Sequence, residues 1–305
     1  MSGGTVPISI VIPTYRRGSS LLRTLGEISA GSSPDEIIIV DQTEQHPAQI
    51  EKELLVLCQR LRAKRIMQAS PSIPVAMNRG LLESRNDVVL FLDDDATPGE
   101  NLLESHLRAH GGRGVGSVAG RVIQPEGARS RARRMELLED LDFDFSSAVP
   151  ARVMNVMAGN LSVNRSAALR AGGFDENFVG VAYRFETDFA RRLAASGYEI
   201  VYEPDALIHH RKESSGGTRT FGDHRRSLSP VHSVGDFYFA LRHLERPLFA
   251  RYVLLRLRRN VLTRYHLRHP WWIPTKMIGE MRGLILALRL YRRGPKLLSK
   301  SHSGS

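Results

Sequence analysis

The chain has 305 residues, of which 42% are hydrophobic and 25% charged, the balance of a globular protein with an ample core. No apolar run approaches the roughly 18 residues needed to span a bilayer, and the opening MSGGTVPIS lacks the basic and apolar regions of a signal peptide. The single cysteine, Cys58, excludes an intrachain disulfide. We therefore expect a cytoplasmic protein in which Cys58 is a small buried thiol.

The net charge of +11 is unevenly distributed along the chain. Residues 225–305 contain 17 Lys/Arg against 3 Asp/Glu, whereas residues 1–224 contain 26 against 29. Any anionic partner that is attracted by charge alone is therefore expected at the C-terminal region.

The N-terminal part alternates short apolar runs with helical periods. The predicted strands are 8–12, 36–40, 65–68 and 88–92, and the predicted helices between them are 19–30, 47–62 and 75–84. Strands without polar alternation that are separated by helices are typical of a parallel sheet covered on both faces. Such sheets bind ligands beyond the carboxyl ends of their strands.

Polar residues follow three of these strands directly. Pro13, Thr14, Tyr15 and Arg16 follow the first, Asp41 the second, and Asp93, Asp94 and Asp95 the fourth. Three carboxylates on one turn suit a hard divalent cation such as Mg2+ or Mn2+. The alternative, an acidic cap for a helix predicted at 98–110, explains one aspartate and not three.

The rest of the chain changes from mixed to helical. A strand is predicted at 116–123, helices at 166–171 and 185–196, and two strands at 199–202 and 206–209. From about residue 230 the pattern is helical, and the segment 274–291 places Met277, Met281, Leu284, Leu288 and Tyr291 on one face. We expect much of this apolar stripe to pack on the preceding domain.

Five segments in order, within residues 7–212, resemble a family-2 glycosyltransferase. They are ISIVIPTYRR, IIIVDQTE, AMNRGLLESRNDVVLFLDDDATP, MAGNLSVNRSAALRAGGFDENF and FETDFARRLAASGYEIVYEPDALIHH. The resemblance implies an α/β fold of GT-A type: a mostly parallel central sheet flanked by helices, with a Rossmann-like nucleotide-binding half. The expected catalytic domain is 1–225, divided into a nucleotide-binding half (1–97) and an acceptor-side half (98–225), and a basic, amphipathic helical region follows at 226–305.

The resemblance implies a UDP- or dTDP-sugar donor. Residues expected around the nucleotide are Pro13, Thr14, Tyr15, Arg16, Asp41, Ala76, Asn78, Asp93 and Asp94. Asp41 would accept a hydrogen bond from the imide N–H of uracil or thymine, and Asp94 would touch the ribose. Gln42 stands where the family often has a second aspartate.

The resemblance also implies a divalent metal, Mn2+ or Mg2+. Asp95 would be the best ligand, while Asp93 would bind a metal-bound water or orient a basic residue. A histidine after the last strand is a further ligand in similar enzymes, and both His209 and His210 are available. The spacing favours His210 slightly.

Glu186 is the expected general base of a transfer that inverts the sugar, with Asp188 as the second possibility because Phe185 stands where the family often has an acid. The alternative is that both acids only favour a helix N-terminus, with Asp188 paired to Arg191 or Arg192. Asn160 and Asp175 are expected near the acceptor, although turn chemistry after two glycines also explains Asp175.

The leading interpretation is an inverting transferase acting on a glycan or lipid-linked acceptor in polysaccharide or surface-glycan biosynthesis. A nucleotidyltransferase or sugar-phosphate pyrophosphorylase is the alternative enzyme, but it would normally show a Gly-rich basic loop after the first strand. A non-catalytic membrane-associated adaptor is the other alternative. The basic helices suit an anionic membrane surface, so we expect peripheral binding at the inner face of the cytoplasmic membrane. The sequence contains no recognised nucleic-acid-binding module, so no nucleic-acid partner is expected.

Overall fold

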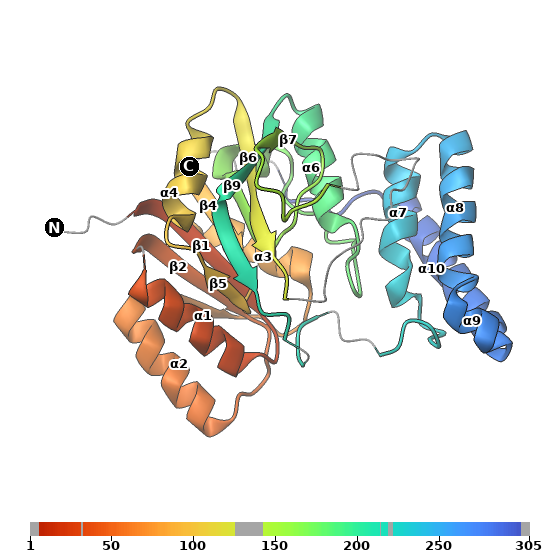
Figure 1. The fold of residues 1–305 in the computed structure, drawn as a ribbon, viewed down its shortest axis with the longest axis horizontal. Helices are drawn as coiled ribbons and strands as arrows, with labels where there is room; N and C mark the ends of the chain where they lie inside the picture. The colour runs from red at the N-terminus through yellow and green to blue at the C-terminus, as the bar shows by residue number, and fades with distance from the viewer. Residues whose placement is uncertain (1–5, 32, 126–142, 214, 219–221, 300–305) are drawn as a thin grey trace.

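The computed structural model describes residues 6–31, 33–125, 143–213, 215–218 and 222–299. Within them one sheet runs in the order β3-β2-β1-β4-β8-β6-β9-β5, with β7 paired to β9. The strands are β1 (Val6–Thr14), β2 (Pro34–Asp41), β3 (Lys64–Met67), β4 (Val88–Leu92), β5 (Ala96–Pro98), β6 (Val115–Ile123), β7 (Ala151–Arg152), β8 (Asn160–Asn164) and β9 (Glu199–His210). Helices cover both faces of this sheet (Figure 1).

The N-terminal half is a parallel sheet between two helical layers. Strand β1 pairs in parallel with β2 and β4, and β2 pairs in parallel with β3. Alternate residues of β1 enter different cores: Ile10 packs with α1 (Gly18–Ala30), α2 (Ala48–Leu61) and α4 (Leu102–His110), whereas Val11 packs with α3 (Ile73–Glu83). Both faces of the sheet are buried, which confirms the parallel sheet predicted from the uninterrupted apolar strands.

The second half of the sheet is mixed. Strand β8 is antiparallel to both β4 and β6, while β6 and β9 are parallel. The sequence predicts two short strands where β9 is a single strand of 12 residues. The predicted helix at 98–110 also begins later, because Ala96–Pro98 pairs with Ile208–His210 as β5. This pairing brings the end of β9 beside the turn that carries the three aspartates.

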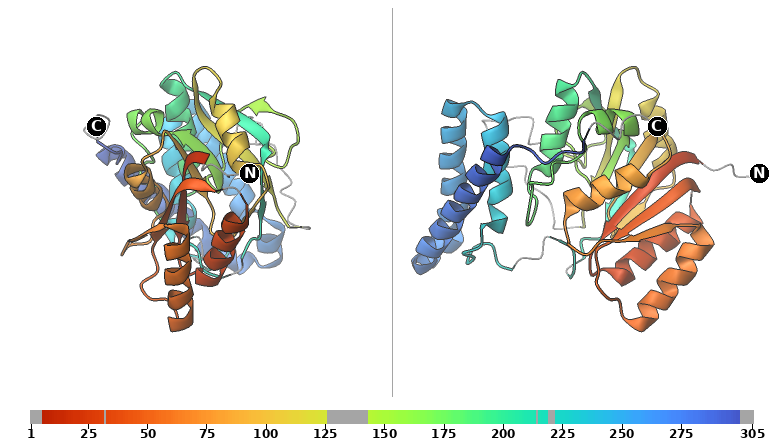
Figure 2. Two further views of the ribbon diagram at one scale, coloured as in Figure 1. Left: turned by 90° about the vertical axis from the view of Figure 1, so that its left-hand side faces the viewer. Right: turned by 180° about the vertical axis from the view of Figure 1, so that it is seen from behind.

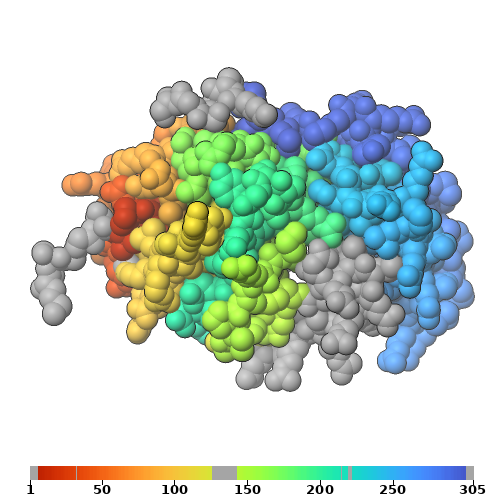
Figure 3. All heavy atoms as spheres, turned by 90° about the horizontal axis from the view of Figure 1, so that it is seen from above, coloured from red at the N-terminus to blue at the C-terminus, as the bar shows by residue number. Residues whose placement is uncertain are grey.

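The C-terminal helices form one end of the molecule, next to the segments around α6 (Figures 1 and 3). They are α7 (Val234–His243), α8 (Arg246–Val261), α9 (Arg264–Arg268) and α10 (Ile273–Arg293), while α5 (Arg165–Arg170) and α6 (Phe185–Ala195) cover the sheet. Helix α10 crosses in front of α7 and α8 in the view from behind (Figure 2). Buried Phe237 and Tyr238 of α7 belong to the same core cluster as Phe185 and Phe189 of α6.

The packing face of α10 differs from the prediction. Met277, Met281 and Tyr291 are exposed, with Met281 58% accessible. The buried face instead carries Lys276, Gly279, Glu280, Gly283, Ala287 and Leu290. A Cβ at Gly279 would meet the carbonyl of Ser227, and one at Gly283 would meet the hydroxyl of Ser233, so small residues are needed for this close approach. Hydrophobic periodicity could not show that the small residues pack inward.

Candidate active site

A cavity of about 320 Å³ lies where β1, β4 and β9 end. Among the residues that line it are Pro13, Thr14, Tyr15, Asp93, Asp94, Glu186 and His210. These side chains come from the first turn, the acidic turn, the start of α6 and the end of β9. The structure therefore brings together several of the predicted nucleotide, metal and catalytic residues in one cavity.

Arg17 is the positive partner of the acidic turn. Its Nη1 lies 3.2 Å from Oδ1 of Asp94 and 3.2 Å from Oδ2 of Asp95, and the hydroxyl of Thr14 donates to Asp94 at 2.7 Å. Burial raises the pKa of Asp94 to about 7, against the opposing effects of Thr14 and Arg17. Burial also acts to raise the pKa of Asp95, but His210 and Arg17 outweigh it and hold that pKa below its ordinary value. Asp95 is therefore ionised at neutral pH.

Asp93, Asp95 and His210 form a group that could hold a metal ion. One ligand atom from each lies within 4.8 Å of the others. Nε2 of His210 is 3.1 Å from Oδ1 of Asp95 and 3.7 Å from Oδ2 of Asp93. Adjacent ligands of an octahedral cation with bonds of about 2.1 Å stand about 3 Å apart, and two carboxylates with an imidazole suit Mn2+. The donor set therefore fits the divalent metal.

Only one of the two predicted histidines points into this cavity. His209 and His210 are consecutive on β9, so their side chains lie on opposite faces of the strand. His209 is exposed, whereas His210 lines the cavity. Nδ1 of His210 lies 3.0 Å from Oε1 of Gln124, an acceptor that leaves Nε2 available to a metal. Gln124 is a residue that the sequence did not single out.

The two predicted catalytic acids occupy different surroundings. Glu186 lines the cavity, while Asp188, two residues later in α6, is fully buried. Oδ2 of Asp188 accepts from Arg192 at 2.8 Å, and its Oδ1 lies 2.8 Å from Nε2 of His243 on α7. Burial acts to raise the pKa of Asp188, but His243 and Arg192 lower it further than burial raises it. Asp188 thus anchors α6 to α7, and Glu186 faces the cavity.

The turn before Glu186 is held in a costly conformation. Ala182 and Arg184 have φ of 51° and 71°, and left-handed backbone at a residue other than glycine costs roughly 1–3 kcal/mol. Nε of Arg184 lies 3.3 Å from Oδ1 of Asp236 on α7. A Cβ at Gly235 would meet the carbonyl of Tyr183, so α7 packs directly against this turn. The C-terminal helices therefore fix the position of Glu186.

Among the described residues that line the cavity are Arg17 and Gln42, but not the predicted Arg16 and Asp41. Arg16 adopts a φ of 55°, which turns its side chain to the surface. Asp41 is fully buried: Thr43 N donates to Oδ1 at 2.9 Å, and Arg65 Nε donates to Oδ2 at 3.0 Å. No signal in the sequence distinguishes Arg17 from its neighbour Arg16.

Ala76 and Asn78 are buried in α3 and are not among the described lining residues. Oδ1 of Asn78 accepts from Phe174 N at 2.8 Å, and its Nδ2 donates to the carbonyl of Phe174 at 2.8 Å. The side chain thus closes two backbone hydrogen bonds with the segment before Asp175. In this structure its contacts position the segment that contains Phe174 and Asp175.

Asp175 holds the C-terminal tail. Its Oδ1 accepts from Lys296 N at 2.9 Å, and its Oδ2 accepts from the hydroxyl of Tyr238 at 2.8 Å. Glu176 N donates to the carbonyl of Lys296 and Leu298 N to that of Gly172, so the tail runs along the segment 172–176. Asp175 is fully buried and outside the described lining of the cavity.

Asn160 belongs to a buried polar chain. Its Oδ1 lies 2.9 Å from Nε2 of His106, whose Nδ1 lies 2.8 Å from the hydroxyl of Ser162. Nε2 of His110 lies 2.9 Å from the same hydroxyl. Burial lowers the pKa of His106 to about 4 and that of His110 to about 3, so both imidazoles are neutral at pH 7. Asn160 supports the sheet next to the cavity. It is not one of the described residues that line the cavity.

Comparison with known proteins agrees with this geometry. The model of glycosyl transferase family 2 matches residues 9–172. The pre-mycofactocin glycosyltransferase of Mycobacterium tuberculosis is 30% identical over 77% of this chain and 48% of its own length. The chain thus spans about half the length of that curated relative.

Two solved structures share the fold. A Staphylococcus aureus TarS structure with UDP-GlcNAc has a TM-score of 0.59 at 13% identity, over 94% of this chain and 92% of that one. A mannosyltransferase from Pyrobaculum calidifontis with GDP-Man and Mn2+ has a TM-score of 0.55 at 18% identity, over 96% and 82%. The sheet, flanked by helices and with a helical C-terminal region, is the GT-A arrangement of these neighbours. By its family model and its fold, the chain belongs to glycosyl transferase family 2.

Proposed function

We propose that the chain is a metal-dependent inverting glycosyltransferase that uses a UDP- or dTDP-sugar. The acceptor is a glycan or a lipid-linked sugar, in polysaccharide or surface-glycan biosynthesis. The observation that carries the proposal is that Asp93, Glu186 and His210, from three distant segments, line one cavity, and that Asp95 lies within ligand distance of Asp93 and His210. Residues 1–225 are the proposed catalytic domain, and residues 226–305 the helical region that supports it.

The chemistry is a single displacement. Glu186 takes the proton of the acceptor hydroxyl while that oxygen bonds to C1 of the donor sugar and the bond from C1 to the diphosphate oxygen breaks. The nucleoside diphosphate leaves on the face opposite to the attack, which inverts C1. Arg17 and the hydroxyl of Thr14 hold the acidic turn in place, and Tyr15 and Gln42 line the donor cavity.

Asp93, Asp95 and His210 would hold the divalent metal, which when bound supplies positive charge that stabilises the departing diphosphate. Asp93 and Asp94 both line the cavity, which supports their proposed place near the nucleotide. Asp41 stays the proposed reader of uracil or thymine only if its contacts with Arg65 and Thr43 rearrange. Gln42 lines the cavity beside it and is an alternative contact for the base.

The two alternatives predict different sites. A pyrophosphorylase needs a basic, Gly-rich loop after β1, whereas Pro13, Thr14 and Tyr15 occupy that turn. A non-catalytic adaptor has no need to keep carboxylates and an imidazole together next to Glu186. Both observations favour the transferase.

A thermal-shift screen tests the proposal. We expect UDP or dTDP to raise the melting temperature of the purified protein when Mn2+ is present and to have little effect in EDTA. GDP, the nucleotide part of the GDP-Man in one neighbouring structure, is the comparison nucleotide. Stabilisation by GDP alone would contradict the proposed donor, and equal shifts with and without metal would contradict the metal dependence.

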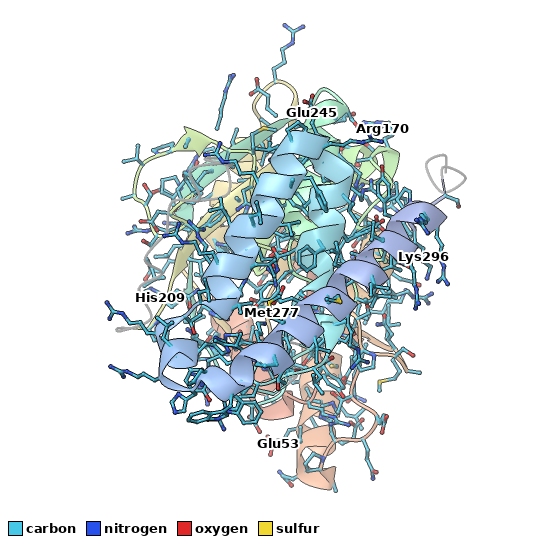
Figure 4. The ribbon with its side chains drawn as sticks, turned by 90° about the vertical axis from the view of Figure 1, so that its right-hand side faces the viewer. Glu53, Arg170, His209, Glu245, Met277 and Lys296 are labelled. Carbon is cyan, nitrogen blue, oxygen red and sulfur yellow. The ribbon has the colours of Figure 1, made fainter. Side chains whose placement is uncertain are left out.

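We also propose that the helical region lies on an anionic membrane. Within the described residues, no helix is long and apolar enough to cross a bilayer. Figure 4 looks onto α8, α9 and α10, whose exposed apolar residues include Leu254, Leu267, Ile278 and Met281. Trp271, between α9 and α10, is exposed as well. Residues 246–299 contain 13 Lys/Arg and one acid, Glu280, which is buried against Arg256 and Lys276. Exposed apolar side chains on helices with a large excess of cations suit an anionic bilayer surface, where each cation near the surface adds about 1 kcal/mol.

Vesicle sedimentation at low salt tests this surface. We expect the protein to pellet with phosphatidylglycerol vesicles and not with pure phosphatidylcholine, and the double variant Ile278→Glu/Met281→Glu to bind at least about tenfold more weakly. The matched control is Leu55→Glu/Val56→Glu on α2, where the two residues are 53% and 60% exposed. Equal binding of both double variants would contradict a role for α10.

A further inference from the structure

A second cavity, of about 600 Å³, adjoins the first. Glu186 and Met157 line both cavities, so the second one opens at the proposed catalytic base. Its wall on the other side comes from the C-terminal helices, through Asp236 of α7, Arg256 of α8 and Lys276 of α10. This wall lies beyond residue 172, where the match to the family model ends.

The wall contains a buried network with an excess of positive charge. Asp236 pairs with Arg184, at 3.3 Å, and with Arg256. Glu280 accepts from Arg256 Nε at 2.9 Å and lies 2.8 Å from Nζ of Lys276. Three cations therefore share two carboxylates, and Lys276 and Glu280 are almost fully buried.

Two further observations place this excess at the cavity. Three cations, Arg184, Arg256 and Lys276, line it, whereas the acids in its lining are two, Asp236 and the proposed base Glu186. The pKa of the lining residue His224 is lowered, first by burial and then by the charge of Lys276. A buried cation excess is stabilised by an anion that can approach it without water.

We propose that this cavity is the acceptor subsite and that the acceptor carries an anionic group, a phosphate or a carboxylate, held by Lys276 and Arg184. The anionic end sits against the helical wall, and a hydroxyl at the other end reaches Glu186. The assignment to an acceptor rests on the proposed transferase function. The anion binding itself does not, because it needs neither donor nor metal.

Isothermal titration of the metal-free protein tests the subsite with three sugars that differ only at C6: glucose 6-phosphate, glucuronate and glucose. We expect at least one of the two anionic sugars to bind about tenfold or more tightly than glucose. Binding of the phosphate alone or of the carboxylate alone identifies which anion the wall selects. Equal affinity for all three sugars, or no binding of either anion, overturns the proposal.

Substitution of Lys276 tests whether the anion binds at this wall or at Arg17 in the first cavity. Lys276→Met removes the excess charge and leaves two cations with two carboxylates, so the network stays balanced. We expect it to abolish the preference for the anion, Lys276→Arg to keep it, and the exposed control Lys296→Met to leave it unchanged. An anion preference that survives in Lys276→Met, with the fold shown intact by its melting temperature, overturns the proposal.

If Lys276→Met unfolds, the Lys276→Arg variant decides: loss of the preference there, with the fold intact, contradicts a charge-based site. Failure of these titrations leaves the transferase proposal standing, because donor binding in Mn2+ is measured separately. Conversely, failure of donor binding leaves an anion site beside Glu186.

Discussion

Replacement of Glu186 by glutamine is expected to lower the rate of sugar transfer by about 10²- to 10⁴-fold, the usual contribution of a general base. Glutamine keeps the size of the side chain but cannot take the proton of the acceptor hydroxyl. Because Glu186 lies outside the group that could hold the metal, the affinity for the nucleotide should stay within about twofold. The measurement is kcat for transfer beside titration of UDP in Mn2+.

Two variants serve as comparisons for Glu186→Gln. Glu53→Gln changes an exposed carboxylate of α2 and should leave kcat unchanged. Asp188→Asn weakens the contacts of a buried carboxylate with Arg192 and His243, so we expect it to lower the melting temperature, which Glu186→Gln should not do. Full transfer by Glu186→Gln, or loss of nucleotide binding in it, would contradict its role as the base.

Replacement of Asp95 by asparagine should lower the affinity for Mn2+ by at least about 10²-fold and transfer with it. Metal affinity falls 10- to 100-fold on loss of residues that only support ligands, and Asp95 is proposed as a ligand. Its carboxylate is fully buried and ionised, with Arg17 and Glu213 N on one oxygen and His210 beside the other. Electron paramagnetic resonance of free Mn2+ measures the affinity directly.

Asp94→Asn is the matched comparison. Asp94 lies outside the group that could hold the metal, and its carboxylate is bound by Thr14 and Arg17. A neutral replacement should therefore weaken Mn2+ binding less there than at Asp95. Equal losses in the two variants, or unchanged Mn2+ affinity in Asp95→Asn, would contradict the proposed ligand set.

Local sequence patterns were enough to predict the architecture of the fold. The parallel strands are recognisable because each is a run of consecutive apolar residues, and Asp93 to Asp95 stand out because three acids follow such a run. The order of the five motif segments then identified the family, which the family model supports. These features depend on neighbours within a few residues of one another.

Features that depend on residues far apart in the chain could not be predicted from the sequence. Asn78 and Asp175 match motif positions, yet their side chains bind backbone 96 and 121 residues away. Arg17 replaces Arg16 in the cavity because of the backbone conformation of one turn. The buried face of α10 depends on how closely glycines let another segment approach, which hydrophobic periodicity does not report.

The contact between the tail and Asp175 has a consequence for biosynthesis. Lys296 and Leu298 hydrogen-bond to the segment 172–176, so Asp175 meets Lys296 only after the 121 residues that follow Asp175 have been synthesised. Domains usually fold as they emerge, starting from the N-terminus. In this protein the parallel sheet can form early, but the region beside Asn78 reaches its final arrangement only after the segment 296–298 has been synthesised.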